Sequence, residues 1–221
     1  MPVDVGELPA IPSLPKRTGT VAPRTLPRQI PRVLLVGAST GGPALLQKLL
    51  VGLPTPFPLP IVIVQHISNG FAAGLAKWLH QTTEHQVELV GGRSTMKPGT
   101  VYVAPDDQDL AVASGLKLEP RKARAALSPC IDVTFQTAAA ALGGRCVALL
   151  LTGMGRDGSQ GMRALWKVGA VTIAQDPATC AVGSMPRSAI ELGAVESIVP
   201  AANLSQSVTT LVQDLLEGPK R

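Results

Sequence analysis

Aromatic residues, cysteine and long apolar runs are all scarce in this sequence. Aromatic residues make up 3% of a chain that is 45% hydrophobic, so its core must be built from Leu, Val, Ile and Ala. No apolar run approaches the roughly 18 residues that span a bilayer, and the N-terminus lacks the apolar region of a signal peptide. The cysteines Cys130, Cys146 and Cys180 are odd in number and widely spaced, which argues against a disulfide framework or a zinc site. We therefore expect a cytoplasmic globular protein with no membrane insertion and no metal.

Excess positive charge is confined to the ends of the chain. The net charge is +5, but residues 33–219 hold thirteen basic and thirteen acidic residues. A neutral body with few aromatic residues is unsuited to nucleic acid, so we expect no nucleic-acid partner. An internal basic cluster is predicted to be a solvated loop, with docking of an acidic partner as the alternative. The cluster comprises Lys117, Arg121, Lys122 and Arg124.

Two parts of the chain differ in composition. Residues 1–31 hold seven of the twenty prolines and no aromatic residue. Such a segment cannot bury enough apolar surface to offset its ordering entropy, so we expect a poorly ordered basic tail or linker. Residues 32–217 are long enough for one domain with a full core.

A glycine-rich turn follows the first apolar run. Residues 33–36 predict a buried parallel strand, and Pro43 suits the first turn of the helix that follows. Between them, residues 37–41 match the pattern G-x-S-x-G, in which a serine, here Ser39, is exposed beside backbone N–H groups that can hold an oxyanion. A helix-capping serine and a phosphate-binding turn remain alternatives at this point.

Two later strands carry polar residues at their carboxyl ends. The strand at 61–64 ends at Gln65 and His66, and the very apolar strand at 146–151, expected in the sheet centre, enters a glycine-rich turn that contains Asp157. Parallel strands end at the same sheet edge, where ligands bind in open α/β sheets. A packed core histidine and a helix N-cap are the structural alternatives for these two residues.

The remaining pattern alternates strands and helices. This alternation predicts an α/β fold, a three-layer doubly wound, mostly parallel sheet with helices on both faces and a small antiparallel hairpin. The hairpin is expected at 110–112 and 116–118. An acidic run of Asp106, Asp107 and Asp109 lacks the glycine and distal glutamate of a calcium loop, so a solvated turn is favoured. Further strands are predicted at 87–90, 101–104 and 171–174, and helices at 71–83, from Ser128-Pro129 to Leu142, around 162–166, 185–192 and 204–216.

The three polar residues form a chemically coherent set. A serine hydroxyl becomes a nucleophile when a neighbouring base takes its proton, and an imidazole base needs a carboxylate to fix its tautomer. Ser39, His66 and Asp157 would supply these groups, in a chain order that differs from the common serine hydrolases. We expect no cofactor.

Six motifs in this order resemble the catalytic domain of the CheB family, the chemotaxis protein-glutamate methylesterases that also deamidate glutamine. The resemblance implies Ser39 as nucleophile, His66 as base and Asp157 as its orienting carboxylate, with Thr40, Gly41 and Met154 shaping the oxyanion site. It also implies the cytoplasmic domain of methylated chemoreceptors as substrate. The motifs are VGASTGGP at 36–43, VQH at 64–66, VYVAP at 101–105, IDVTF at 131–135, LLTGMGRDG at 150–158, and AQD with MPRSAI at 174–176 and 185–190.

The chain departs from the family pattern in several places. Family members usually carry an N-terminal receiver domain where this chain has the proline-rich segment, so its activity is expected to be constitutive or controlled by a separate protein in trans. Other departures lie near the expected site and leave the exact substrate open; they are Asp106, Asp109, Leu127, Ser128, Gly183 and Ser184.

The sequence argues against two other functions. A nucleotide site would need a G-x-G-x-x-G pattern and an acidic ribose contact about 20 residues on, and neither is present. A catalytically idle adaptor that binds receptors or other signalling proteins would have no chemical need for the three polar residues.

Overall fold

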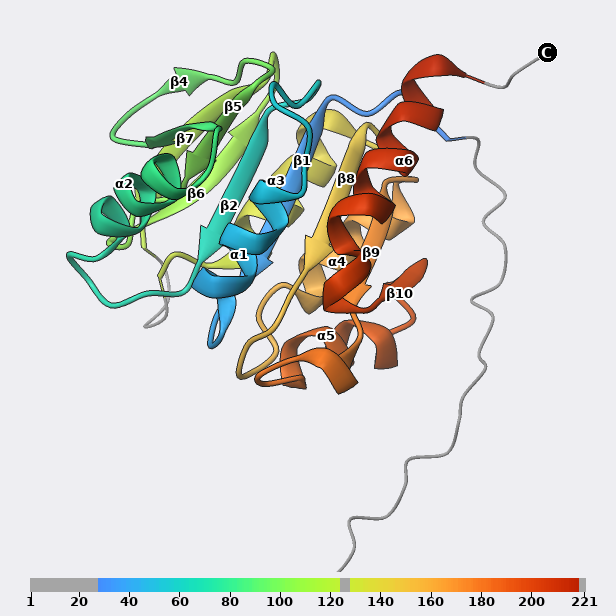
Figure 1. Cartoon of the computed structure of the whole chain (residues 1–221). Coiled ribbons are helices and arrows are strands. Elements are labelled where there is room, and N and C mark those ends of the chain that lie inside the picture. Colours follow the sequence, from blue (N-terminus) through green and yellow to red (C-terminus); the bar gives the residue numbers. More distant parts are fainter. Residues whose placement is uncertain (1–27, 124–127, 219–221) are drawn as a thin grey trace, which may run out of the picture.

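The computed structural model describes residues 28–123 and 128–218 (Figure 1). Most of the predicted N-terminal tail, together with Arg124 and Leu127, lies outside these residues. Residues 28–32, which lead into the first strand, have no regular secondary structure, and Arg28 forms an ion pair with Glu196.

A seven-stranded parallel sheet forms the centre of the molecule. Its strands, in sheet order, are β10 (Ser197–Val199), β9 (Val171–Gln175), β8 (Cys146–Leu150), β1 (Val33–Ala38), β2 (Ile61–Gln65), β5 (Thr100–Val103) and β3 (Gln86–Leu89). All neighbouring pairs are parallel. The chain extends the sheet from the middle strand β1 through β2 in one direction and from β8 in the other, so the order reverses between β1 and β8. This reversal creates the switch point at which doubly wound sheets bind ligands.

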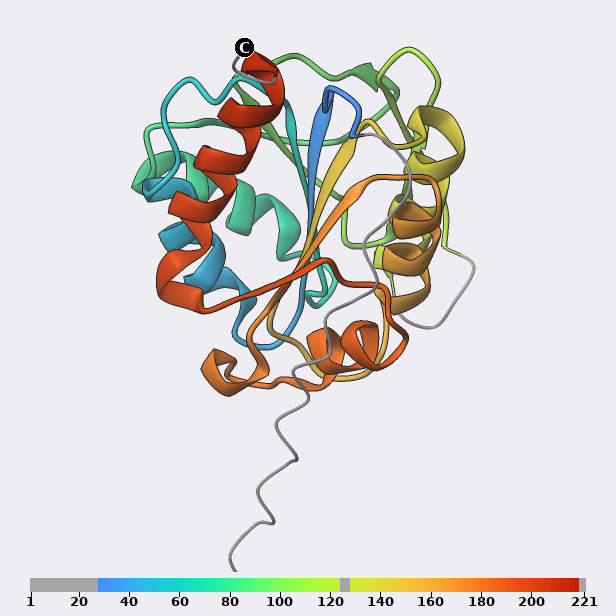
Figure 2. The same ribbon diagram turned by 90° about the vertical axis from the view of Figure 1, so that its right-hand side faces the viewer.

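Helices cover both faces of this sheet, as predicted (Figure 2). Alternate residues of each strand point to opposite faces, so Val33 and Leu35 lie in one core cluster and Leu34 and Val36 in the other. The second cluster includes α1 (Gly42–Val51), α2 (Ala72–Thr82) and α6 (Leu204–Glu217). The first includes α3 (Ile131–Leu142), α4 (Ser159–Lys167) and α5 (Ser184–Glu191).

A small antiparallel sheet packs on the face that also carries α3. The predicted hairpin is β6 (Gln108–Ala113) with β7 (Lys117–Lys122), and β4 (Ser94–Thr95) adds a third strand. The predicted basic loop is therefore wrong: Lys117, Arg121 and Lys122 belong to a strand. Their side chains are nevertheless exposed, because Leu118 takes the buried face of β7.

The acidic run after β5 is only in part the solvated turn that the sequence predicts, since Asp107 is exposed but Asp109 is buried in β6. Asp109 is 1% exposed and accepts a hydrogen bond from the backbone N–H of Cys130, just before α3. Asp106 accepts one from the N–H of Ala72, the first residue of α2. The prediction failed because two helices begin at this edge, and their unpaired N–H groups need acceptors.

Short elements complete the fold. The structure contains two 3-10 turns, η1 (Pro177–Thr179) and η2 (Ala201–Asn203), beside the short strand β10. Within residues 28–123 and 128–218, no helix has both the length and the apolar character needed to cross a bilayer.

Candidate functional site

Ser39 and His66 follow directly on two paired strands. Ala38 and Gln65 are register partners and end the adjacent strands β1 and β2, so Ser39 and His66 are the first residues after these strands. The backbone N–H of His66 donates to Ala38 O at 3.0 Å, and that of Ser39 donates to Thr152 O at 2.9 Å, just beyond β8. Three neighbouring strand ends therefore meet around Ser39, beside the switch point of the sheet.

The turn after Ser39 leads directly into α1. Gly41 has φ 80°, a left-handed conformation that favours glycine, and acts as the N-cap with no side-chain hydrogen bond. Ser39 is therefore not a capping serine. Among the described residues, no hydrogen bond uses the backbone N–H groups of Thr40 or Gly41. These groups lie at the positive end of α1, where a developing oxyanion would be stabilised.

Asp157 is held by many donors at the start of α3. Its Oδ2 lies 2.7 Å from His66 Nε2, within hydrogen-bond distance, and the side chains are 6% exposed for His66 and 12% for Asp157. The same carboxylate accepts four more hydrogen bonds, from the backbone N–H groups of Ile131, Asp132 and Gly158 and from the thiol of Cys130. Asp157 thus caps α3, which lies earlier in the chain, while it also contacts the histidine.

These donors determine the charge of Asp157. Burial raises the pKa of its carboxyl group, but the hydrogen bonds from His66 and from the N–H groups of Asp132 and Ile131 outweigh burial and lower the pKa to about 2. An ionised carboxylate only accepts hydrogen bonds, so the Nε2 of His66 must carry the proton and donate. The remaining ring nitrogen, Nδ1, is then the one that can accept a proton. The two ring nitrogens have the reverse of their roles in the chymotrypsin arrangement.

In the described chain, no hydrogen bond joins Ser39 Oγ to the His66 ring. Ser39 is buried at the carboxyl edge, with 9% of its surface exposed. Hydrogen bonds between nucleophile and base are often long in free enzymes and tighten when substrate binds. The arrangement agrees with that behaviour.

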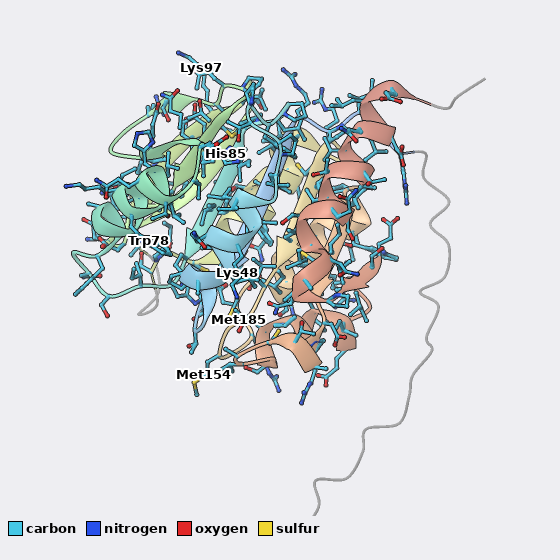
Figure 3. All side chains as sticks on the ribbon, viewed as in Figure 1. Lys48, Trp78, His85, Lys97, Met154 and Met185 are labelled. Atoms are coloured by element: carbon cyan, nitrogen blue, oxygen red, sulfur yellow. The ribbon has the colours of Figure 1, made fainter. Side chains whose placement is uncertain are left out.

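The turn after β8 forms a third wall of the site. Gly153 packs so closely that a Cβ built there would lie 2.6 Å from Ser39 Cβ and 2.2 Å from Met185 Sδ. The next residue, Met154, is 73% exposed, and Figure 3 shows its side chain beyond the carboxyl edge of the sheet. Its backbone N–H forms no hydrogen bond within the described residues. Ser184, one of the departures from the family pattern, braces this turn by donating to Gly153 O and accepting from Gly155 N–H.

Sequence reasoning missed Gln65, which lies between the two predicted residues. Its Nε2 donates to the backbone oxygens of Ser39 and His66, each at 2.8 Å, and the side chain is buried. The amide therefore ties the two strand ends together. A polar residue in an otherwise apolar buried strand is a signal that could have found it, because a buried amide must be hydrogen-bonded.

Asp157 also lines a pocket. Its volume is about 470 Å³, and it lies between the starts of α3 and α4 and the end of α5. Its lining includes Cys130, Asp132, Arg156 and Glu191. In the part of the chain that the structure describes, no group of three or more His, Cys, Asp or Glu side chains could hold a metal ion.

The fold and the site define a doubly wound α/β protein with a serine, a histidine and an aspartate at the switch edge of its sheet. Residues 34–208 match the family model described as CheB methylesterase. The chain belongs to the CheB methylesterase family. The comparison confirms the resemblance expected from the sequence motifs.

Individual relatives of the chain are also named as methylesterases. The chain is 41% identical over 182 residues to protein-glutamate methylesterase/protein-glutamine glutaminase 2 of Anaeromyxobacter dehalogenans, covering 82% of this chain and 53% of the relative. It is 38% identical over 178 residues to protein-glutamate methylesterase FrzG of Myxococcus xanthus, covering 80% and 53%. The chain thus spans about half the length of these curated relatives.

The solved catalytic domain of the Thermotoga maritima CheB methylesterase has a similar structure. The TM-score is 0.77 at 36% identity, and the match covers 82% of this chain and 99% of that domain. The three-layer fold predicted from the sequence is therefore confirmed.

Proposed function

We propose that this protein is a cytoplasmic serine hydrolase that removes methyl groups from γ-glutamyl methyl esters on the cytoplasmic domain of chemoreceptors. The observation that carries the proposal is the buried hydrogen bond between His66 and the ionised Asp157, at the strand end beside Ser39. Family membership and the names of the relatives support the choice of substrate.

The proposed reaction is acyl transfer through Ser39. Its Oγ attacks the ester carbonyl while His66 Nδ1 takes the hydroxyl proton, and Asp157 stabilises the imidazolium. The tetrahedral oxyanion is held by the N–H groups of Thr40, Gly41 and Met154, a type of contact typically worth roughly 3 to 4 kcal/mol per donor.

Collapse of this intermediate releases methanol, which takes the proton from His66. The glutamyl group then remains as an ester on Ser39. Water attacks this ester with His66 as base. The glutamate side chain is released from the enzyme, and the hydroxyl of Ser39 is regenerated. Glutamine follows the same path with ammonia as the leaving group, so we propose deamidation as a second activity.

The test is methanol release from a purified, methylated receptor cytoplasmic fragment, with no phosphodonor added. We expect release by the wild-type protein and a loss of at least about 1,000-fold in Ser39→Ala. Ser68→Ala is a matched control, because Ser68 is an exposed serine in the loop that follows His66. Equal methanol release by Ser39→Ala and the wild type would show that Ser39 is not the nucleophile. Absence of release from the wild-type protein, while a relative acts on the same sample, would exclude this substrate.

A further inference from the structure

We propose that Asp132 is a positioning residue for this reaction, because it fixes the turn that presents Asp157 to His66. The proposal rests on the proposed function. Asp132 lies in the first turn of α3, and its Oδ1 accepts a hydrogen bond of 2.6 Å from the backbone N–H of Gly161, in the first turn of α4. The two helices start side by side, on the same face of the sheet.

The arrangement is reciprocal. Asp157, just before α4, accepts the N–H groups of Ile131 and Asp132 at the start of α3. Asp132, at the start of α3, accepts the N–H of Gly161 at the start of α4. Asp157, which precedes α4, therefore caps α3, and Asp132, which belongs to α3, caps α4. These hydrogen bonds hold the two helix starts together.

Close packing leaves little room for a different arrangement. A Cβ at Gly161 would lie 2.4 Å from Phe135 Cβ and 3.2 Å from Asp132 Oδ1. A Cβ at Gly158 would lie 2.9 Å from Ile131 Cγ2. Both glycines let the turn around Asp157 approach α3 closely enough for both carboxylates to reach their donors.

The role of Asp132 is separable from direct contact with His66. Its backbone N–H binds Asp157 and is unaffected by a side-chain substitution, whereas its side chain binds backbone N–H groups at the start of α4, from Gly158 to Gly161. The N-cap of α4 is Gly158, which offers no side-chain hydrogen bond of its own. Without the Asp132 carboxylate, the first turn of α4 would lose this side-chain acceptor, and the position of Asp157 would be less well fixed.

The experiment compares Asp132→Ala and Asp132→Asn with Thr83→Ala. Asparagine keeps the accepting oxygen and removes the charge, so it separates capping from electrostatics. Thr83 is a matched control, because its buried side chain also forms hydrogen bonds at a helix end: it donates to Leu79 O and accepts from the N–H of His85 at the C-terminal end of α2. The measurements are kcat and KM for methanol release, thermal unfolding, and the NMR resonance of the His66 Nε2 proton.

We expect Asp132→Ala to lower kcat about 10- to 100-fold with KM within about twofold of the wild type. Asp132→Asn should retain kcat within about threefold. Thr83→Ala should retain kcat while it loses a comparable amount of thermal stability. Retention of kcat in Asp132→Ala, or an equal loss in Thr83→Ala, would overturn the positioning role.

The NMR measurement keeps this proposal distinct from the proposed activity. In the wild type, the His66 Nε2 proton should give a downfield resonance, because it forms a short hydrogen bond to Asp157. This resonance should move upfield or broaden in Asp132→Ala and persist in Asp132→Asn, whether or not methanol is released. An unchanged resonance would contradict the proposal independently of the substrate. If Asp132→Ala does not fold, Asp132→Ser, whose shorter side chain cannot span the same distance, takes its place with the same expectations.

Discussion

At the residue scale, five hydrogen bonds to one carboxylate make Asp157 a determinant of stability as well as a candidate catalytic group. Its pKa in the folded protein is about 2, below the ordinary value of 3.8. The ionised form is therefore favoured by folding, and this stabilisation is fully present above about pH 4. It is lost as the pH falls from about 4 to about 2, and amounts to about 2 kcal/mol.

We therefore predict an acid-sensitive difference between the wild type and Asp157→Asn. The amide cannot ionise, so its contribution to the free energy of unfolding does not change with pH. The gap between the two proteins, measured by urea unfolding, should shrink by about 1 kcal/mol between pH 5 and pH 3. A gap that stays constant over this range would mean that Asp157 is not preferentially ionised in the folded state.

Cys130 donates to the same carboxylate, and its thiol should be unreactive. The pKa of Cys130 is raised to about 12, chiefly by burial; a backbone hydrogen bond at Val133 lowers it, and the negative charges of Asp157 and Asp132 raise it. Because only the thiolate is alkylated, we predict that iodoacetamide at pH 8 modifies Cys130 roughly 1,000-fold more slowly in the folded protein than in urea. Peptide mapping by mass spectrometry gives both rates. A folded-state rate within tenfold of the unfolded rate would contradict the prediction.

The candidate site was predictable from the sequence only where a residue follows a recognisable strand. Ser39, His66 and Asp157 each stand at or just beyond the end of an apolar run, so the topology brings them to one edge. Asp132 stands inside a helix, and its contact with Gly161 depends on how two helices pack. No local pattern encodes that distance. The roles of Thr40 and Met154 in binding an oxyanion stay predictions.

At the scale of elements, the fit between the turn after β8 and the start of α1 depends on glycine. Gly153→Ala would place a methyl group against both Ser39 Cβ and Met185 Sδ. We predict a loss of about 1 to 3 kcal/mol in the free energy of unfolding and at least a tenfold loss of kcat. Urea unfolding and methanol release measure the two effects.

Gly74→Ala provides a contrast within the same protein. Gly74 lies inside α2, and a Cβ there would meet no atom within 4 Å. Alanine should therefore raise the free energy of unfolding by about 0.5 to 1 kcal/mol and leave kcat unchanged. If Gly153→Ala behaved in the same way, the close packing against Ser39 would have no functional importance.

The longer elements were predictable because their apolar residues repeat over many positions. The strand predicted at 33–36 extends to Ala38, and the helix at 204–216 matches α6 within a residue. The strands β4 and β10 were missed, because two or three residues cannot establish a period. The basic cluster in β7 was misjudged, because its exposed charges outnumber the single buried Leu118.

At the scale of the whole molecule, alternation of strands and helices predicts the layers but not the order of the strands. β3 precedes β5 in the chain but pairs outside it, at the edge of the sheet. That order depends on long-range packing, which no local pattern records. The limits of the domain, 32–217, stay a prediction, since residues 1–27 lie outside the described structure.

Both helix layers depend on a single shared sheet. Each central strand contributes alternate residues to the two core clusters, so the strands bury apolar surface on both sides. Loss of one helix layer would expose one face of each central strand and weaken the packing of the other layer. We therefore expect the two layers to unfold together, although the chain is longer than most two-state proteins.

The two tryptophans allow a direct test of this cooperativity. Trp78 (labelled in Figure 3) lies in α2, and Trp166 lies in α4; the two helices pack on opposite faces of the sheet. In the single-tryptophan variants Trp78→Phe and Trp166→Phe, fluorescence reports on one layer at a time, while circular dichroism reports on the whole fold. We predict that, within each variant, fluorescence and circular dichroism give the same midpoint in urea. A fluorescence transition that precedes the circular dichroism transition in one variant would show that its helix layer separates first. The carboxyl edge, where both layers meet around Ser39, would then open before the sheet unfolds, and methanol release would be lost at the same urea concentration.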